Sequence, residues 1–447
     1  MRRLIDAELA RWTTAPRRKP LIVRGARQVG KTFSIRALGQ THFDDTVLID
    51  LERNRDWHRV FEGNLDARRI LKELEVLAGK RVQPKKTLLF FDEIQACPRA
   101  ITALRYFYEE VPELHVVAAG SLLEFAQGEI SIPVGRVQFI EMHPMTFAEY
   151  LWAVGNDAAA GTVLDKAKPL PEATHRFLLE EVKRYCFIGG MPESVLAYLG
   201  GKSLQEAFSV QKDLCETYRQ DFAKYGPRAD PRCQDEVFLT VAQRVGQQVK
   251  YARLAQGFSG PTIKNAFELL CKARVVRKVP SCNPPLLPLG ASASPKRFKA
   301  ILLDVGMWQH LSGMKSAAEY AREDLLDIYR GAMAEQFVGQ EMVVSQNDEL
   351  YYWGRETRGS TAEVDFLGVV EGAVHGVEVK SGSAGKLKSL HLLLESNPNV
   401  ASGLVFSSGP YAELPGQKLT FLPLYWAFSA TGGPQRVGWQ ETRHDVT

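Results

Sequence analysis

The 447-residue sequence lacks three features that would place it in a special class of protein. None of its six cysteines forms a C-x-x-C pair, and no secretory apolar segment precedes them. This pattern argues against a zinc site and favours reduced thiols. No apolar stretch approaches the ~20 residues that a membrane-spanning helix needs. We therefore expect a soluble, cytoplasmic protein that does not bind a membrane.

Length and composition predict an ordinary multidomain protein. A chain of this size exceeds one typical hydrophobic core, so we expect roughly two to four domains. Hydrophobic residues make up 45% of the sequence and charged residues 24%. These values are those of an average globular protein, and they argue against extensive disorder.

Basic residues are concentrated in one part of the chain. The net charge is only +4, but residues 246–299 contain ten lysines and arginines and one acidic residue, Glu268, for a net charge of +9. The rest of the chain then carries −5. A basic block in an otherwise acidic protein predicts contact with nucleic acid, and a solvated basic face is the alternative.

A glycine-rich stretch near the N-terminus has the pattern of a phosphate-binding loop. In PLIVRGARQVGKT, an apolar strand at residues 21–23 leads through G-x-x-x-x-G-K-T into a helical pattern. Glycines at these positions let backbone N–H groups surround phosphate, the lysine faces the β and γ phosphates, and the threonine hydroxyl suits Mg²⁺. We expect ATP to bind at Gly25, Gln28, Val29, Gly30, Lys31 and Thr32.

A second motif, KTLLFFDEIQ at residues 86–95, fits a buried parallel strand that ends in two carboxylates. Asp92 would hold Mg²⁺ through water. Glu93 would orient and deprotonate the water that attacks the γ phosphate, which favours hydrolysis over binding alone. An acidic pair that caps the next helix is the alternative.

Two further strands, expected at residues 46–52 and 115–121, alternate with helical stretches and predict a parallel α/β sheet. Ser121 ends its strand as Asp92 does, so it could sense the γ phosphate or could cap the next helix. Arg136 follows a glycine in a loop. It is a candidate arginine finger in cis or in trans, and a plain surface arginine is the alternative.

An ordered series of stretches resembles the AAA-type P-loop ATPases of bacteria and archaea that carry a C-terminal domain of unknown function. It is also similar to the archaeal ATPases of the signal-transduction P-loop group. The resemblance spans nearly the whole chain and implies an AAA-like ATPase, a winged-helix segment and a nuclease-like C-terminal fold. The stretches are GARQVGKT, LLFFDEIQ, AAGSLLEF, VGR, HPMTFAEYL, YCFIGGMPESV, YRQDFAKYG, KAILLDVGMW and AEVDFLG with VEVKSG.

The middle of the chain is consistent with that order. Residues 172–225 have helical periodicity and suit a helical subdomain. A short helix, a Gly/Ser break and a helix that starts at Pro261 then form a helix-turn-helix pattern, and two wing strands follow around a proline-rich loop at residues 280–295. Lys264 and Asn265 lie early on the predicted recognition helix, where side chains reach DNA. Contact with a protein is the alternative.

Charged residues interrupt two apolar strands in TAEVDFLGVVEGAVHGVEVKSG. Because side chains alternate along a strand, Glu378 and Lys380 share one face. A hairpin would bring Asp365 beside Glu378. With Glu335 on the preceding helix, the set resembles the PD-(D/E)XK nuclease core.

Metal chemistry would explain this set. Glu335, Asp365 and Glu378 can hold Mg²⁺ through oxygen atoms, and Lys380 can position or activate the attacking water. Buried groups of this kind must pair with one another or bind a metal. The alternative is an inactive fold in which Lys380 pairs with Glu378 and Asp365.

These patterns predict an α/β fold with a parallel-sheet P-loop ATPase domain, a helical subdomain, a winged helix and a restriction-endonuclease-like α/β domain. The expected boundaries are 1–165, 166–232, 233–315 and 316–447. The predicted function is an Mg²⁺-dependent ATPase that binds DNA and whose nucleotide state controls a metal-dependent nuclease-like domain. A non-nucleolytic ATP-dependent switch and a toxin or defence component acting on RNA are the alternatives. Monomers, dimers and AAA-type homo-oligomers all fit.

Overall fold

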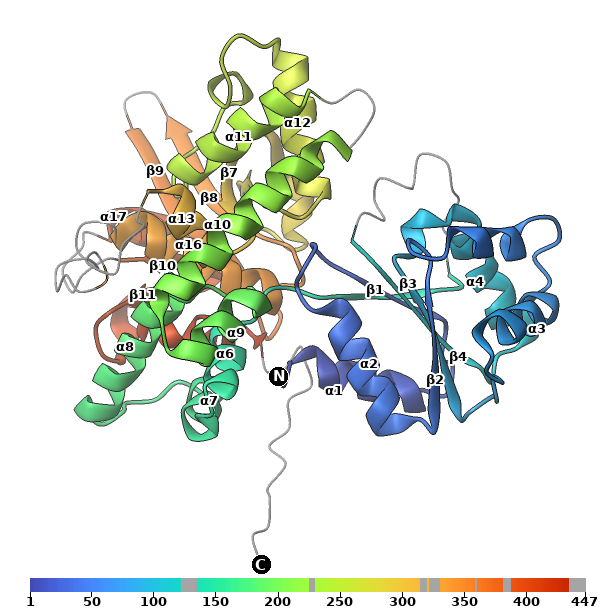
Figure 1. The fold of residues 1–447 in the computed structure, drawn as a ribbon. Helices are drawn as coiled ribbons and strands as arrows, with labels where there is room; N and C mark the ends of the chain where they lie inside the picture. The colour runs from blue at the N-terminus through green and yellow to red at the C-terminus, as the bar shows by residue number, and fades with distance from the viewer. Residues whose placement is uncertain are drawn as a thin grey trace, which may run out of the picture. The chain divides into compact units, whose positions relative to one another are not determined.

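The computed structural model describes residues 1–121, 133, 135–224, 230–313, 320, 330–357, 360–380 and 387–433. Contacts divide the chain into two compact units, and the division falls between His143 and Pro144 (Figure 1). Within the described residues, no helix is both long enough and apolar enough to span a membrane.

The first unit contains a five-stranded parallel sheet with strand order β2-β3-β4-β1-β5. Helices α1 and α2 lie on one face of this sheet, and α3 and α4 lie on the other (Figure 1). The strands are β1 (Leu21–Arg24), β2 (Asp45–Asp50), β3 (Thr87–Asp92), β4 (His115–Gly120) and β5 (Gln138–Glu141). The helices are α1 (Ile5–Thr14), α2 (Lys31–His42), α3 (Ala67–Ala78) and α4 (Pro98–Glu110).

Burial explains why these strands occupy the centre of the unit. Every residue of β3 and of β4 is buried, as expected for parallel strands covered on both faces. On the face of α3 and α4, the rings of Phe61, Phe91 and Phe107 pack against one another. Because all five strands are parallel, the residues that follow them lie along one edge, where α/β proteins bind ligands.

The second unit begins with helices that pack around aromatic side chains. The rings of Phe147, Tyr150, Tyr185 and Phe337 contact one another and join α6 to α8 and α16. The buried carboxylate of Asp304 accepts hydrogen bonds from backbone N–H groups on two segments. The helices are α6 (Phe147–Ala153), α7 (Asp157–Leu164), α8 (Glu172–Ile188), α9 (Pro192–Gly201), α10 (Leu204–Asp221), α11 (Pro231–Gln243), α12 (Gly260–Lys272), α13 (Val305–Leu311), α16 (Arg330–Ser345), α17 (Lys388–Ser396) and α18 (Ala427–Ala430).

A mixed eight-stranded sheet completes the second unit, with order β12-β13-β11-β10-β9-β8-β6-β7. The antiparallel hairpin β6–β7 joins β8 through one residue pair, Ser281 with Tyr352. The strands are β6 (Val276–Cys282), β7 (Ala293–Leu302), β8 (Tyr351–Thr357), β9 (Ser360–Val370), β10 (Ala373–Val379), β11 (Val400–Ser407), β12 (Ala412–Leu414) and β13 (Leu419–Pro423).

The predicted α/β fold class is confirmed at this level. A parallel α/β sheet comes first, helices follow, and a second, mixed sheet lies toward the C-terminus. The predicted strands at residues 21–23, 46–52, 86–95 and 115–121 correspond to β1, β2, β3 and β4. The predicted hairpin also forms, because β9 and β10 pair antiparallel around a turn at Glu371 and Gly372.

Candidate functional sites

The loop between β1 and α2 requires glycine at two positions. Gly30 precedes α2 with φ of 99°, in the left-handed region that favours glycine. At Gly25 a Cβ atom would lie 2.1 Å from the carbonyl oxygen of Met142, so no larger residue fits. Both predicted glycines therefore allow the compact loop that a phosphate-binding site needs.

Lys31 lies inside this loop. Its side chain is buried, and its Nζ donates to the carbonyl oxygens of Gly25 at 3.1 Å and Ala26 at 2.7 Å. Gln28 and Val29, the other two predicted contacts, lie in the same loop, where Gln28 has a positive φ of 60° and Val29 is buried. The loop thus surrounds a buried cation, as expected for a site that receives phosphate.

Thr32 and Asp92 meet although they are 60 residues apart. The Thr32 hydroxyl donates to Asp92 Oδ2 at 2.8 Å. Burial and the neighbouring carboxylates of Glu93 and Asp50 raise the pKa of Asp92, while the bond from Thr32 opposes that rise. A hydroxyl and a buried carboxylate with no cationic partner among the described residues form a donor set suited to Mg²⁺.

Glu93 follows β3 with φ of 49°, a left-handed conformation that is uncommon for a non-glycine residue. Its carboxylate accepts a hydrogen bond from the side-chain amide of Gln95, two residues later. We did not predict the contribution of Gln95 from the sequence, although its place in the DEIQ motif was a usable signal. The amide orients the carboxylate that the sequence assigns as the base.

Two more supporting residues were missed. Asp50, at the end of β2, is paired in register with Asp92 and raises its pKa. Arg3 is 6% exposed, and its guanidinium donates to the carbonyl oxygens of Val29 at 2.8 Å and His143 at 2.7 Å. Arg3 therefore supports the phosphate-binding loop from the N-terminal segment, and nothing in its local sequence indicates this contact.

Ser121 lies directly after β4, at the same edge of the sheet. Ser121 is 2% exposed, and its hydroxyl has no hydrogen-bond partner among the described residues. This buried hydroxyl is compatible with the predicted sensor role, which stays a prediction. The alternative role of Ser121, as the cap of the next helix, depends on residues 122–127, which lie outside the described part of the chain.

Arg136 is far from the phosphate-binding loop within this unit. It precedes β5, whose first residue, Gln138, pairs with Leu21 at the start of β1. Arg136 therefore lies at the opposite edge of the parallel sheet, where its Nε is 2.8 Å from Glu109 Oε1. This position does not fit an arginine finger in cis, because β1 separates it from the loop at Gly25. A role in trans stays a prediction.

The basic block of residues 246–299 is partly neutralised inside the second unit. Arg274 and Arg277 both pair with Asp348, at 3.2 and 3.0 Å. Lys278 pairs with Glu268 at 3.0 Å. Together with Lys299, these account for four of the ten basic residues, and the other six have exposed side chains: Lys250, Arg253, Lys264, Lys272, Lys296 and Arg297.

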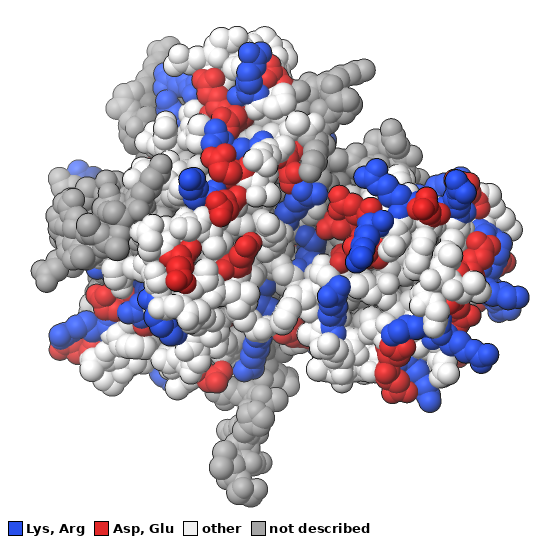
Figure 2. Space-filling model, in the orientation of Figure 1, with Lys and Arg blue, Asp and Glu red and all other residues white. Residues whose placement is uncertain are grey.

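The start of α12 has the exposure that the sequence predicts for a recognition helix. Ser259 caps it, because its hydroxyl accepts from the backbone N–H of Thr262. Lys264 and Asn265 are exposed, whereas the apolar residues of the helix are buried. Figure 2 shows acidic side chains interleaved with basic ones over the α11–α12 region, so this face is not uniformly basic.

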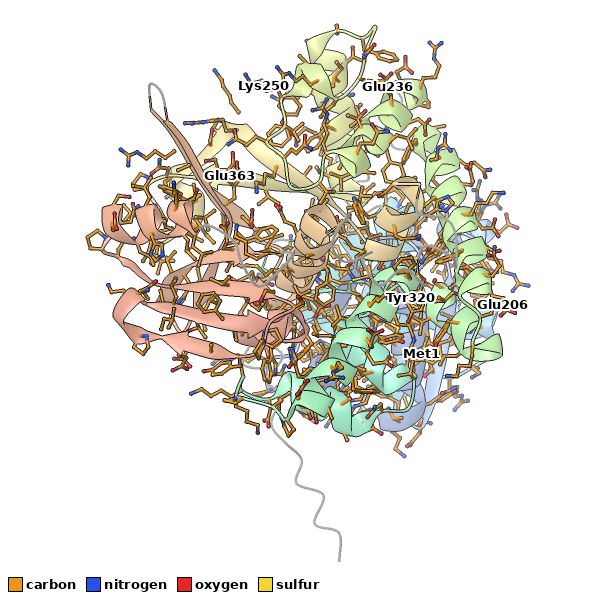
Figure 3. The ribbon with its side chains drawn as sticks, turned by 90° about the vertical axis from the view of Figure 1, so that its left-hand side faces the viewer. Met1, Glu206, Glu236, Lys250, Tyr320 and Glu363 are labelled. Atoms are coloured by element: carbon orange, nitrogen blue, oxygen red, sulfur yellow. The ribbon has the colours of Figure 1, made fainter. Side chains whose placement is uncertain are left out.

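The second candidate site lies on β9 and β10 and contains an unpredicted lysine. Lys299, on β7, is 1% exposed. Its Nζ lies 2.6 Å from Glu363 Oε1, 3.0 Å from Glu335 Oε1 and 3.2 Å from Asp365 Oδ1. Figure 3 labels Glu363 on the long strand β9, beside the β6–β7 hairpin. We call Lys299 and these three carboxylates the Lys299 cluster.

The other predicted residues adjoin the Lys299 cluster. Asp365 Oδ2 accepts from the backbone N–H of Val379 at 2.8 Å, which brings β10 beside it. Lys380 pairs with Glu378, as expected for two side chains on one face. Burial, and then the charge of Asp365, raise the pKa of both Glu335 and Glu378.

The Lys299 cluster does not fit a divalent metal ion. Within the described residues, no group of three or more His, Cys, Asp or Glu side chains is arranged to hold a metal. Lys299 binds two of the three predicted ligands, Glu335 and Asp365, and Lys380 binds the third, Glu378. The sequence pattern brings the correct residues together, but lysine ammonium groups hold their oxygen atoms.

Three family models match separate parts of the chain. Residues 17–151, which include the parallel sheet and its loop, match a family described as AAA domain, and we call this part of the chain the AAA-type domain. Residues 179–318 and 330–426 match two families, each described as a domain of unknown function (DUF8612 and DUF4143). No curated protein matches the sequence.

Three solved structures illustrate the likeness of this chain to known folds. An Orc1 protein of Aeropyrum pernix in complex with DNA is 11% identical, with 70% of this chain and 93% of that chain covered and a TM-score of 0.31. A RuvB protein of Thermotoga maritima is 17% identical, with 62% and 87% covered and a TM-score of 0.28. AMPPCP-bound DnaA of Aquifex aeolicus is 10% identical, with 60% and 86% covered and a TM-score of 0.25. These TM-scores are too low to support any conclusion about function.

Proposed function

We propose that this protein binds and hydrolyses ATP in its AAA-type domain and uses a winged-helix segment to bind DNA. The observation that carries the ATPase proposal is the convergence of Lys31, Thr32, Asp92 and Glu93 at one edge of the parallel sheet. They are joined by the 2.8 Å bond between Thr32 and Asp92 and by the buried position of Lys31. This arrangement supports the roles proposed for the four residues.

The roles follow from the chemistry of each group. Lys31 neutralises the β and γ phosphates, and the N–H groups of the surrounding loop bind their oxygens. Thr32 and Asp92 would hold Mg²⁺, which supplies charge neutralisation at the phosphates when it is bound. Glu93, oriented by Gln95, takes the proton of the attacking water. Ser121 contacts the γ phosphate, and homo-oligomerisation would let Arg136 act on a neighbouring copy.

Two substitutions separate binding from turnover. Lys31→Ala should abolish ATP binding, measured with a fluorescent ATP analogue. Glu93→Gln should retain binding but lower phosphate release by roughly 10²-fold or more, because a general base is lost. Glu113→Gln removes an exposed carboxylate that precedes β4, at the opposite edge of the sheet, and should leave both measurements unchanged. Normal turnover in Glu93→Gln would assign the base to another residue.

The DNA-binding proposal depends on the α12 region. α12 follows α11 and leads into the antiparallel hairpin β6–β7, and an isolated antiparallel bridge pairs Val249 with Phe298 of β7. This order supports the winged-helix proposal. Lys264 and Asn265 are exposed near the start of α12, and Lys296 and Arg297 are exposed on β7, the wing strand. A winged helix that contacts a protein instead would not bind duplex DNA at low salt.

The C-terminal sheet has two candidate roles. A metal-dependent nuclease under nucleotide control would cleave plasmid DNA with Mg²⁺ or Mn²⁺ and would lose that activity in Lys380→Ala. A non-nucleolytic regulatory element would cleave nothing, with or without ATP. The contacts of Lys299 favour the second role, because they engage the carboxylates that a nuclease would use.

A further inference from the structure

The Lys299 cluster satisfies every donor of the lysine. A protonated lysine carries three N–H donors, and Lys299 has three carboxylate oxygens within 2.6 to 3.2 Å, one each from Glu335, Glu363 and Asp365. The ring of Tyr352 lies 5.5 Å from the same nitrogen and adds a cation–π contact. An ammonium group with 1% exposure must be paired in this way to remain charged.

Two of the three carboxylates also accept a hydrogen bond at their second oxygen. Glu363 Oε2 accepts from the Gln248 side chain at 2.8 Å, and Asp365 Oδ2 accepts from the Val379 backbone at 2.8 Å. Glu335 Oε2 faces Gly246, where an added Cβ would lie only 2.6 Å away. Loop 246–248 therefore closes the cluster. Within the described residues, Glu378 Oε2 is buried and has no hydrogen-bond partner.

A divalent ion would compete with Lys299 for these oxygens. Mg²⁺ binds carboxylate oxygens at about 2.1 Å and prefers six ligands. Any position at that distance from Glu335 Oε1 lies within about 5 Å of the ammonium nitrogen, which itself lies 3.0 Å from this oxygen and 3.2 Å from Asp365 Oδ1. The two cations would repel each other with little solvent between them.

We propose that Lys299 is the resident cation of this site and takes the place of the divalent metal ion that Glu335, Asp365 and Glu378 would otherwise bind. The cluster is then a structural joint. It ties the hairpin β6–β7 to α16 and β9, because its members come from these three elements. The inference goes beyond the proposed function and does not depend on ATP hydrolysis or on DNA binding.

Mn²⁺ binding to the full chain without nucleotide tests this proposal. All variants carry Asp92→Asn, which removes the metal site of the AAA-type domain, and bound Mn²⁺ is counted from the loss of the electron paramagnetic resonance signal of the free ion. We expect no bound Mn²⁺ in this background and no change when Asp365→Asn is added. Adding Lys299→Met instead removes the charge while keeping an unbranched side chain. About one Mn²⁺ per chain should then bind, and adding Asp365→Asn as well should abolish it.

Two results would overturn the proposal. The first is Mn²⁺ binding in the Asp92→Asn background that disappears when Asp365→Asn is added, since the site would then accept metal with Lys299 present. The second is a folded Lys299→Met chain that binds no Mn²⁺, since the carboxylates would then not be a latent metal site. If Lys299→Met does not fold, comparing the Asp92→Asn chain with and without Asp365→Asn still decides whether the site accepts metal while Lys299 is present. Circular dichroism spectra of each variant establish folding.

Discussion

The salt dependence of DNA binding measures how many basic residues of the 246–299 block reach phosphate groups. On B-DNA, log K falls with log salt with a slope of about −0.9 for each phosphate neutralised. The sequence offers ten basic residues, which would allow a slope of about −9. The structure pairs at least four of them with carboxylates, and the other six have exposed side chains. The slope should therefore be no steeper than about −5.

This difference is large enough to measure. Between 50 and 200 mM KCl, a slope of about −5 lowers affinity by roughly 10³-fold, whereas about −9 lowers it by more than 10⁵-fold. Fluorescence anisotropy of a labelled duplex, titrated at several salt concentrations, gives the slope directly. Lys264→Ala should make the slope less steep by about one unit, because one phosphate contact is lost.

A matched control separates a local contact from net charge. Lys212 is exposed on α10, outside the basic block, and Lys212→Ala removes the same charge as Lys264→Ala. It should leave the slope unchanged. A slope near −9 would mean that the ion pairs of Arg274, Arg277, Lys278 and Lys299 open on DNA, and it would refute the reasoning. Absence of binding at low salt would remove the DNA proposal itself.

Three further predictions follow from individual contacts. Gln95→Ala should preserve ATP binding but lower turnover by roughly tenfold, the equivalent of about 1.4 kcal/mol, because Glu93 loses the amide that orients it. Stopped-flow measurement of phosphate release checks this prediction, and unchanged turnover would contradict it. Arg3→Met should lower the free energy of unfolding of the AAA-type domain by about 2–4 kcal/mol, since two buried carbonyl groups lose their hydrogen-bond donor. Urea denaturation measures this change, and Arg2→Met, which replaces an exposed arginine, is the control. Burial raises the pKa of Glu341 from 4.5 to about 8, so the stability that its protonated form contributes is fully present below pH 4.5 and is lost as the pH rises toward 8. The free energy of unfolding of Glu341→Gln should therefore rise relative to that of wild type as the pH increases from 5 to 8, by at most about 5 kcal/mol. Urea denaturation measures both proteins, and the same pH dependence in the two would show that Glu341 does not titrate in this range.

Local patterns were sufficient to predict much of the AAA-type domain. The loop from Gly25 to Thr32 depends on residues that are neighbours in the chain, so its spacing alone indicates the site. Alternation along β9 and β10 likewise placed Glu378 and Lys380 on one face, and their ion pair agrees with that placement. Asp92 could be assigned because an unbroken apolar strand ends at it.

The residues that sequence analysis missed or misplaced depend on contacts between distant segments. Lys299 is 66 residues from Asp365, and no local spacing relates them. Arg136 lies on the wrong edge of the sheet for a role in cis, since the strand order β2-β3-β4-β1-β5 places the start of β5 beside the start of β1. The basic block seemed uniform only because Asp348, which binds Arg274 and Arg277, lies outside it in sequence.

The sequence by itself therefore determined the phosphate-binding loop, the strand that carries Asp92 and the faces of β9 and β10, because backbone periodicity and short spacings fix these within a few residues. Only the tertiary structure decided which charges remain exposed and which cation the C-terminal carboxylates hold. The physical reason is that ion pairing depends on distance in space, and the order of strands in a sheet brings together charges from segments that are far apart in the chain.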